Sequence, residues 1–337
     1  MKKVSLFIAA LCVVAFAGCN SKSDANSSDS AELKIYSIID EEETLALTEL
    51  FTQKTGIKTN FLRASTGELV NRVLTEKNDP QADILLGGAS SYHIKADAEG
   101  ALETYESPLA QGLPSYAVSK DGTWTGFCVL TLGIGINNSL YKEKFPSLPL
   151  PQTWDDLLRP EYKGEVVLTN PVSSSTAYLF VQNQLQRLGQ DKGWEYLLNL
   201  VPLVGQFPDS GSAPAKLICT GEYPIGISFT HELARLKTEG YDVELVAPPK
   251  TAGDVDCISI MKNSKNLDAA KKFVDFMLSP EAQELMCKIS FATPVNPNAK
   301  RVPGTVGIES LDLIDYDVNA ASSQKDAVLT KWSKEVK

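Results

Sequence analysis

Three consecutive serines and a threonine, Ser173–Thr176, stand where a strand pattern gives way to a helix pattern. Residues 165–169 are rich in β-branched side chains, which favours a strand, and Pro171 interrupts it. Apolar residues then recur on one arc of about 140° at 3.6 residues per turn, until Gly189 offers a helix end. Free backbone N–H groups and the positive end of the helix dipole at such a start suit an anion. The serines could equally act only as helix caps, so the motif needs support from the rest of the chain.

Two other predicted helix starts carry small and hydroxylated residues. Residues 65–67 follow a strand pattern, and Ser65 with Glu68 fits the capping-box pattern S-x-x-E. Residues 210–214, which include Ser212, precede a third helix pattern. An acidic run at 40–43 follows the first predicted strand, although acidic residues in a first helical turn also complement the helix dipole without any ligand.

Strand and helix patterns alternate from residue 33 onward. The first strand patterns cover 33–39, 58–62 and 82–87, and the helix patterns that follow them cover 42–54, 67–77 and 91–99. This alternation predicts an α/β fold with a parallel sheet covered on both faces, in which ligands bind at the carboxyl ends of strands. The apolar, glycine-interrupted run 126–138 predicts a long strand that crosses to a second lobe, and 256–261 predicts a return strand.

Residues 1–18 have the features of an export signal, with two lysines and an apolar run too short for a stable membrane anchor. The residues before Cys19 resemble a bacterial lipobox, which predicts lipidation of Cys19. Phe16 stands where that motif usually has leucine, and an ordinary cleaved signal is the alternative. Polar, serine-rich residues complete a predicted tether over 19–32. We therefore expect a periplasmic or cell-surface protein held to the membrane by an N-terminal lipid.

The net charge of −10, about −12 once the two N-terminal lysines are removed, argues against a nucleic-acid partner. It leaves an anionic small molecule open, because local amides decide a buried site. The cysteines after Cys19 are Cys128, Cys219, Cys257 and Cys287. In an exported protein they could form disulfides in any of three pairings, and they show no CxxC spacing typical of a metal site.

Several segments, taken in order, resemble one protein family. Residues 151–164, PQTWDDLLRPEYKG, with Asn170-Pro171, resemble a signature of bacterial extracellular solute-binding proteins of the ferric, phosphonate and hexose-phosphate group. Residues 132–138, 219–226 and 271–286 resemble that family's crossing strand, its G-E-Y-P-I-G turn and its C-terminal helical segment. The resemblance implies a two-lobed periplasmic-binding-protein-like (type II) fold with hinge strands, which closes on a ligand and delivers it to an ABC permease in the cytoplasmic membrane.

On this basis we expect lobe one to comprise residues 33–132 with about 257–300, and lobe two to comprise 133–256 with about 301–337. The expected ligand is a small anion, a sugar phosphate or phosphonate, because three hydroxyl-rich helix starts could converge on the cleft. The resemblance to hexose-phosphate binders is closest at 174–176 and at His231-Glu232, with Asp254 at the position of a family acidic residue. The candidate ligand-binding residues are Asp40, Ser65, Thr66, Gly67, Ser173, Ser174, Ser175, Thr176, Ser212, His231, Glu232 and Asp254.

Ferric iron is the first alternative ligand. Ferric binders of this family usually place a Tyr-Tyr pair after the strand that corresponds to 224–229, whereas this chain has Phe229-Thr230-His231-Glu232 and no Tyr-Tyr. If iron were the ligand, His231 and Glu232 would be its ligands; otherwise we expect no metal and no cofactor.

Other functions remain open at this stage. A polyamine would fit the acidic charge, although the aromatic residues are scattered rather than grouped as a cage. A sensor subunit would use the same closed shape, and a transferase-like enzyme could share the two-lobed fold. No Walker, G-x-S-x-G or H-E-x-x-H pattern occurs in the sequence, so we expect binding by a monomer and no catalysis.

Overall fold

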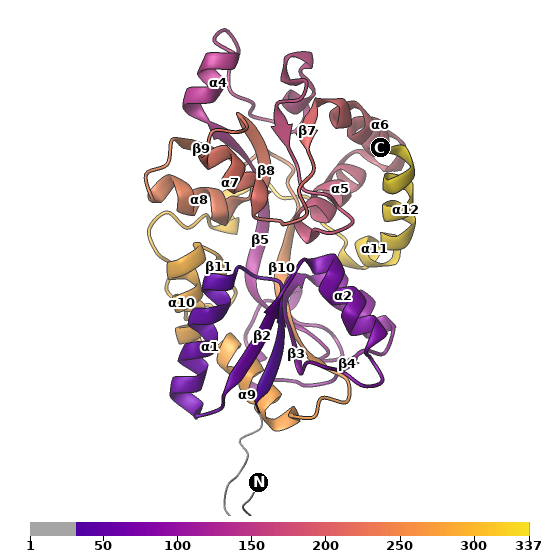
Figure 1. Ribbon diagram of the computed structural model, residues 1–337, viewed down its shortest axis with the longest axis vertical. Coiled ribbons are helices and arrows are strands. Elements are labelled where there is room, and N and C mark those ends of the chain that lie inside the picture. Colours follow the sequence, from indigo (N-terminus) through magenta and orange to yellow (C-terminus); the bar gives the residue numbers. More distant parts are fainter. Residues whose placement is uncertain (1–31, 337) are drawn as a thin grey trace, which may run out of the picture. The chain divides into compact units, whose positions relative to one another are not determined.

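The computed structural model describes residues 32–336 (Figure 1). The predicted export signal, Cys19 and all of the tether but its last residue lie outside the described residues. The described part is an α/β protein in which one set of strands and helices is built around the first predicted strands and another around the Ser173 region. We call these lobe one and lobe two.

Lobe one contains the predicted parallel strands. Its strands are β1 (Leu33–Ser37), β2 (Thr59–Arg63), β3 (Ile84–Ala89), β4 (Leu102–Glu103) and β11 (Thr293–Pro294), joined by parts of the two crossing strands β5 (Thr125–Asn137) and β10 (Gly253–Met261). Strand β1 pairs in parallel with both β2 and β3, which confirms that part of the prediction. Strand β10 pairs antiparallel with β3 and with β5, so the sheet is mixed rather than wholly parallel. The reason is that β5 leaves lobe one and β10 returns to it, and the two strands therefore run in opposite directions.

Helices cover the sheet of lobe one on both faces (Figure 1). They are α1 (Glu41–Thr55), α2 (Thr66–Thr75), α3 (Ser90–Ala98), α9 (Leu267–Leu278) and α10 (Pro280–Ser290). Helix α1 packs against α10, and α2 packs against α3. Phe51 of α1 meets Phe273 of α9 edge-on, with 5.0 Å between ring centroids, in the buried core.

Lobe two is built on the second half of β5. Its other strands are β6 (Val166–Val167), β7 (Val204–Gln206), β8 (Ile225–Phe229) and β9 (Val243–Val246), and its helices are α4 (Asn138–Lys144), α5 (Ser175–Leu188), α6 (Gln190–Leu200), α7 (Ala213–Cys219) and α8 (Thr230–Thr238). All of β5 is buried, as its apolar sequence predicts. A Cβ atom at Gly135 would collide with Leu233 of α8 and Ile218 of α7, so this glycine lets both helices pack directly on the strand. The strand predicted at 165–169 is shorter, because only its residues 166–167, which form β6, pair with β8 before the chain turns toward the Ser173 loop.

The chain ends with α11 (Val318–Ser323) and α12 (Lys325–Glu335). We expected this segment in lobe two, and it touches both lobes. Helix α11 packs on α3 of lobe one, and the carbonyl of Ala321 accepts a hydrogen bond from the hydroxyl of Tyr178 in α5. Short 3-10 helices complete the described chain: η1 (Pro108–Ala110), η2 (Ser115–Ala117), η3 (Asp155–Leu158), η4 (Pro160–Tyr162), η5 (Val201–Leu203) and η6 (Ile308–Ser310). The residues at which the lobes begin and end stay a prediction.

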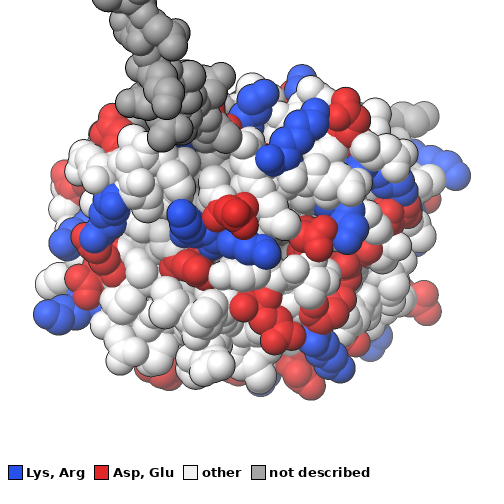
Figure 2. Space-filling model, turned by 90° about the horizontal axis from the view of Figure 1, so that it is seen from below, with Lys and Arg blue, Asp and Glu red and all other residues white. Residues whose placement is uncertain are grey.

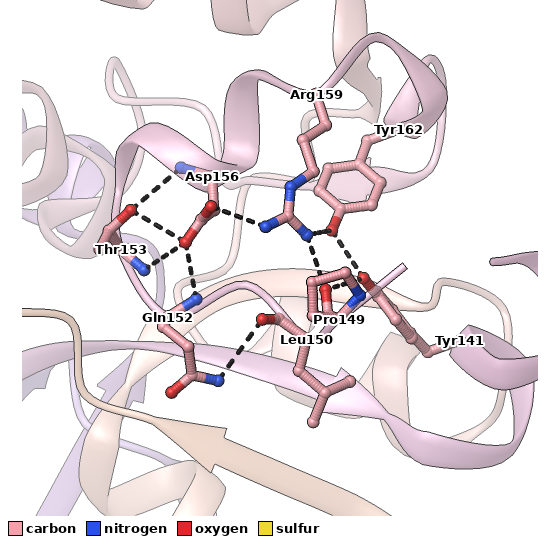
Figure 3. A network of polar contacts seen from close by, with 8 residues as sticks. All are labelled: Tyr141, Pro149, Leu150, Gln152, Thr153, Asp156, Arg159 and Tyr162. Carbon is pink, nitrogen blue, oxygen red and sulfur yellow. Dashed lines mark hydrogen bonds and ion pairs between the residues drawn. The ribbon is translucent and has the colours of Figure 1, made fainter. Parts of the chain in front are cut away.

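The motif at 151–164 is a structural scaffold (Figure 3). One carboxylate oxygen of Asp156 accepts hydrogen bonds from the backbone N–H groups of Gln152 and Thr153 at 3.0 and 2.9 Å. Its other oxygen pairs with Arg159 at 2.7 Å, and Arg159 also donates to the hydroxyl of Tyr162 at 3.0 Å. The same Tyr162 hydroxyl lies 2.7 Å from that of Tyr141. These bonds tie the start of η3 to α4 and give Thr153, Asp156 and Tyr162 of the motif a structural role.

The four described cysteines are free thiols, so none of the three disulfide pairings is present. Cys128, Cys257 and Cys287 are buried, and Cys219 is partly exposed. On the face in Figure 2, basic and acidic side chains of the described residues intermingle rather than gathering by sign. Between residues 32 and 336, no helix combines the length and the apolar character needed to cross a bilayer.

Candidate functional site

A cavity lies where the loops after β1 and β2 of lobe one face the starts of α5, α7 and α8 of lobe two. Its empty volume is about 880 Å³, including space open to solvent. Ten of the twelve residues predicted as ligand-binding line it: Asp40, Ser65, Thr66, Ser173, Ser174, Ser175, Thr176, Ser212, His231 and Glu232. Residues far apart in the sequence therefore meet around one space.

The start of α5 has unused hydrogen-bonding groups. Ser174 occupies the N-cap position, yet its side chain makes no capping bond, and its hydroxyl oxygen, in a residue only 2% exposed, has no hydrogen-bond partner within residues 32–336. The first intrahelical bond runs from the N–H of Tyr178 to the carbonyl of Ser174 at 3.1 Å, so the N–H groups of residues 175–177 have no acceptor inside the helix. The side chain of Ser174 therefore does not act as a helix cap.

The start of α2 behaves differently. The hydroxyl of Ser65 caps the helix by accepting from the N–H of Glu68 at 3.4 Å, whereas the Glu68 carboxylate turns to Arg72, so only half of the predicted capping box forms. The hydroxyl of Thr66 lies 3.3 Å from that of Ser175 in lobe two. The hydroxyl-rich helix starts of the two lobes therefore face each other directly.

Two predicted residues are absent from the cavity lining. Gly67 donates its backbone N–H to the carbonyl of Ser173 at 3.0 Å and joins the lobes there. Asp254 is buried beside α3, where its carboxylate accepts from the N–H groups of Ser90 and Val255 at 3.4 and 2.7 Å. Burial raises the pKa of Asp254 to about 6. Both placements depend on contacts with segments far away in the sequence, which local patterns do not reveal.

His231 lines the cavity and has an unpaired ring nitrogen. Its ring stacks on Phe229 with 5.4 Å between centroids, and its Nδ1 atom has no hydrogen-bond partner among the described residues. Desolvation lowers the pKa of His231 to about 4, so the imidazole is neutral at neutral pH. A neutral imidazole can donate through one nitrogen and accept through the other, which suits a hydroxyl of a ligand.

Carboxyl groups form another part of the lining. Glu232 accepts a hydrogen bond from the Ser228 hydroxyl at 2.5 Å, and burial raises its pKa to about 8. Asp40 is held by the Ser212 hydroxyl at 3.2 Å and lies 3.5 Å from Arg63. These contacts orient acceptor oxygens, which can bind hydroxyl or amine groups of a ligand.

Two further carboxyl groups of the lining are absent from the predicted set of ligand-binding residues. Burial raises the pKa of Glu43, in the first turn of α1, to about 8, and its carboxylate accepts from Ser290 at 3.1 Å. Asp256 accepts from the N–H of Gly88 at 2.6 Å, and burial raises its pKa to about 7. Glu43 stood in the acidic run 40–43, and Asp256 is two residues beyond Asp254 on the same strand. Within residues 32–336, no cluster of three or more His, Cys, Asp or Glu side chains could hold a metal ion.

Comparison with known proteins agrees with this geometry. Residues 79–316 match the family described as "Bacterial extracellular solute-binding protein". The periplasmic binding protein AfuA from Actinobacillus pleuropneumoniae, solved with exogenous fructose-6-phosphate bound, is 33% identical with a TM-score of 0.88, over 90% of this chain and 98% of that chain. The periplasmic binding protein P5PA is 35% identical with a TM-score of 0.86, over 91% of this chain and 99% of that chain.

A more distant relative is iron uptake protein A1 of Synechocystis, which is 25% identical over 82% of this chain and 80% of its own length. The two-lobed periplasmic-binding-protein-like fold implied by the sequence resemblance is confirmed by these structures. The family also indicates a periplasmic location, a small-molecule ligand and a permease partner. This chain belongs to the bacterial extracellular solute-binding proteins of ABC importers.

Proposed function

We propose that this protein captures a phosphorylated small molecule, a sugar phosphate or a phosphonate, by closing its two lobes around it. The observation that carries the proposal is the start of α5, where the unpartnered hydroxyl of Ser174 and the N–H groups of 175–177 meet Thr66 of the other lobe at one cavity. A phosphate oxygen is an acceptor for all of these groups, and the helix dipole adds to the attraction.

The expected hydrogen bonds supply enough free energy to bind the phosphorylated ligand. Each hydrogen bond to a charged acceptor contributes about 1.5–3 kcal/mol, so four or five of them sustain roughly micromolar affinity, about −8 kcal/mol, after the cost of association. His231, Asp40 and Glu232 would bind the rest of the ligand. The fructose-6-phosphate bound by the AfuA relative supports this ligand class. A ligand that bridges both lobes favours the closed state, because it binds that state more tightly.

Ferric iron is the second candidate, favoured by the similarity to iron uptake protein A1. Ferric binders of the family usually have a tyrosine pair after the strand that corresponds to 224–229, and this chain lacks that pair, so His231 with Glu232 would be the ligands that remain. Two such ligands without phenolates make a weak site for Fe(III), a hard cation. We therefore favour the phosphorylated ligand.

Thermal unfolding of the purified protein with glucose 6-phosphate, glucose, 2-aminoethylphosphonate and ferric citrate separates the candidates. A rise in Tm with the phosphate or the phosphonate, but not with glucose, is the expected result. A response to ferric citrate alone would reject the proposal. Recovery of the ligand unchanged, checked by mass spectrometry, tests our further proposal that the protein binds without turnover, and size-exclusion chromatography with light scattering tests our proposal that it is a monomer. Partition of wild type and Cys19→Ala into detergent tests the proposed lipid anchor.

A further inference from the structure

Three carboxyl groups of the cavity lining, of which Glu43 is buried and the other two are partly buried, lack a cationic partner. They are Glu43 of α1, Glu232 of α8 and Asp256 of β10, and no ion pair within residues 32–336 includes any of them. Glu43 is only 7% exposed. An ionised carboxylate that is buried without a countercharge is costly, so such a group either keeps its proton or waits for a cation.

The nearby cations are engaged elsewhere. Arg63 and Lys216 pair with Asp40 at 3.5 and 3.8 Å, and Arg235 pairs with Glu239 at 2.7 Å. Arg235 and Lys216 lower the pKa of Glu232 in part, but burial dominates and raises it. The cavity therefore holds more acidic groups than its own basic groups balance.

The three carboxyl groups also have unused acceptor capacity. One oxygen of each accepts a hydrogen bond, from Ser290, Ser228 or the N–H of Gly88. The second oxygen accepts from no group in residues 32–336 other than a weak contact, at 3.9 Å, between the Cys128 thiol and Asp256. The three come from lobe one, lobe two and a crossing strand, and all of them line the cavity. No hydrogen bond connects them to Ser173–Thr176.

We propose that the ligand carries a protonated nitrogen in addition to its phosphate or phosphonate group, and that Glu43, Asp256 and Glu232 together supply the countercharge for this nitrogen. An ammonium group has three donors and a full positive charge, so it supplies both the missing countercharge and the missing hydrogen bonds. The buried and unpartnered hydroxyl of Ser174 independently marks the place of the anionic group. This inference rests on the proposed function and narrows its ligand class to zwitterions such as aminosugar phosphates and aminophosphonates.

Isothermal titration of the purified protein at pH 7.5 tests the inference with three sugars that share the phosphate. They are glucose 6-phosphate, glucosamine 6-phosphate and N-acetylglucosamine 6-phosphate, in which the nitrogen is absent, charged and neutral respectively. We expect glucosamine 6-phosphate to bind at least tenfold more tightly than the other two. In Glu43→Gln this ratio should fall below threefold, whereas in Glu41→Gln, an exposed residue outside the cavity lining, the ratio should persist.

Two results would overturn this inference and leave the proposed function intact. One is binding of glucose 6-phosphate that equals or exceeds that of glucosamine 6-phosphate, which would mean that protonated carboxyl groups bind neutral hydroxyls instead. The other is a preference for the amine that survives undiminished in Glu43→Gln, Glu232→Gln and Asp256→Asn. Failure of all three sugars and of 2-aminoethylphosphonate to bind would instead overturn the proposed function.

Discussion

The backbone N–H of Gly67, at the start of α2, donates a hydrogen bond to the carbonyl oxygen of Ser173, ahead of α5, at 3.0 Å. This bond joins the two lobes beside the cavity. A Cβ atom on Gly67 would lie 2.6 Å from the carbonyl oxygen of Val172 and 3.2 Å from the Cα of Ser173. Because backbone atoms cannot move aside as a flexible side chain can, only glycine allows the lobes to approach this closely here.

Gly67→Ala should therefore hinder closure without unfolding lobe one. The residue lies in a helix, where alanine is favourable, so the ligand-free Tm should change little. The affinity for glucose 6-phosphate should fall at least tenfold, and the radius of gyration in saturating ligand should stay near its ligand-free value in X-ray scattering. Glu68→Ala, the exposed next residue, is the control. Wild-type affinity in Gly67→Ala would show that this contact does not limit closure.

Ser174→Ala should weaken ligand binding without lowering the stability of the ligand-free protein. The hydroxyl is buried without a partner, so its removal should leave the free energy of unfolding of the ligand-free protein unchanged or higher. The affinity for a phosphorylated ligand should fall about 10- to 150-fold, the equivalent of one hydrogen bond to a charged acceptor. Urea unfolding and titration calorimetry measure the two effects. A loss of stability with no loss of affinity would make Ser174 a structural residue.

Local patterns predicted the elements well, because helix starts, glycine stops and apolar periodicity act over a few residues. The helix at Leu267–Leu278 appears with the predicted bounds, and the long crossing strand differs by one residue at each end. Ten of the twelve candidate residues line the cavity, since loops after parallel strands lie at one edge of a sheet, although His231 and Glu232 were expected from the family resemblance rather than from a local pattern.

The rest could not be predicted because it depends on contacts between distant segments. Gly67 and Asp254 looked like ligand residues, yet one meets the backbone of the other lobe and the other lies beneath α3. Glu43 was indistinguishable from its acidic neighbours until the fold buried it and left Glu41 exposed. Strand β10 returns from lobe two to lobe one and therefore runs antiparallel to β5. The periodicity of its sequence does not show this direction.

Asp156→Asn should reduce stability without affecting ligand binding. Burial raises the pKa of Asp156, but hydrogen bonds from Gln152 and Thr153 and the charge of Arg159 outweigh it, so the pKa lies below its usual range. Loss of this charge should lower the free energy of unfolding by about 1–3 kcal/mol. Urea unfolding checks the loss, with the exposed Glu161→Gln as control. An unchanged midpoint would show that the network in Figure 3 adds little to stability.

Glu43→Gln should change how the stability of the ligand-free protein depends on pH. Burial raises the pKa of Glu43 from 4.5 to about 8, so between these values the folded state holds a proton that the unfolded chain has released. The wild-type free energy of unfolding should therefore fall, relative to that of Glu43→Gln, as pH rises through this range, by up to a few kcal/mol. His93 and His231, whose pKa values burial lowers to about 4, act in the opposite sense between pH 4 and 6.5. Both histidines are present in both proteins, so their contributions cancel when the two free energies of unfolding are subtracted. Urea unfolding of both proteins from pH 5 to 9 measures it, and a difference that stays constant with pH would mean that Glu43 is ionised in the folded protein.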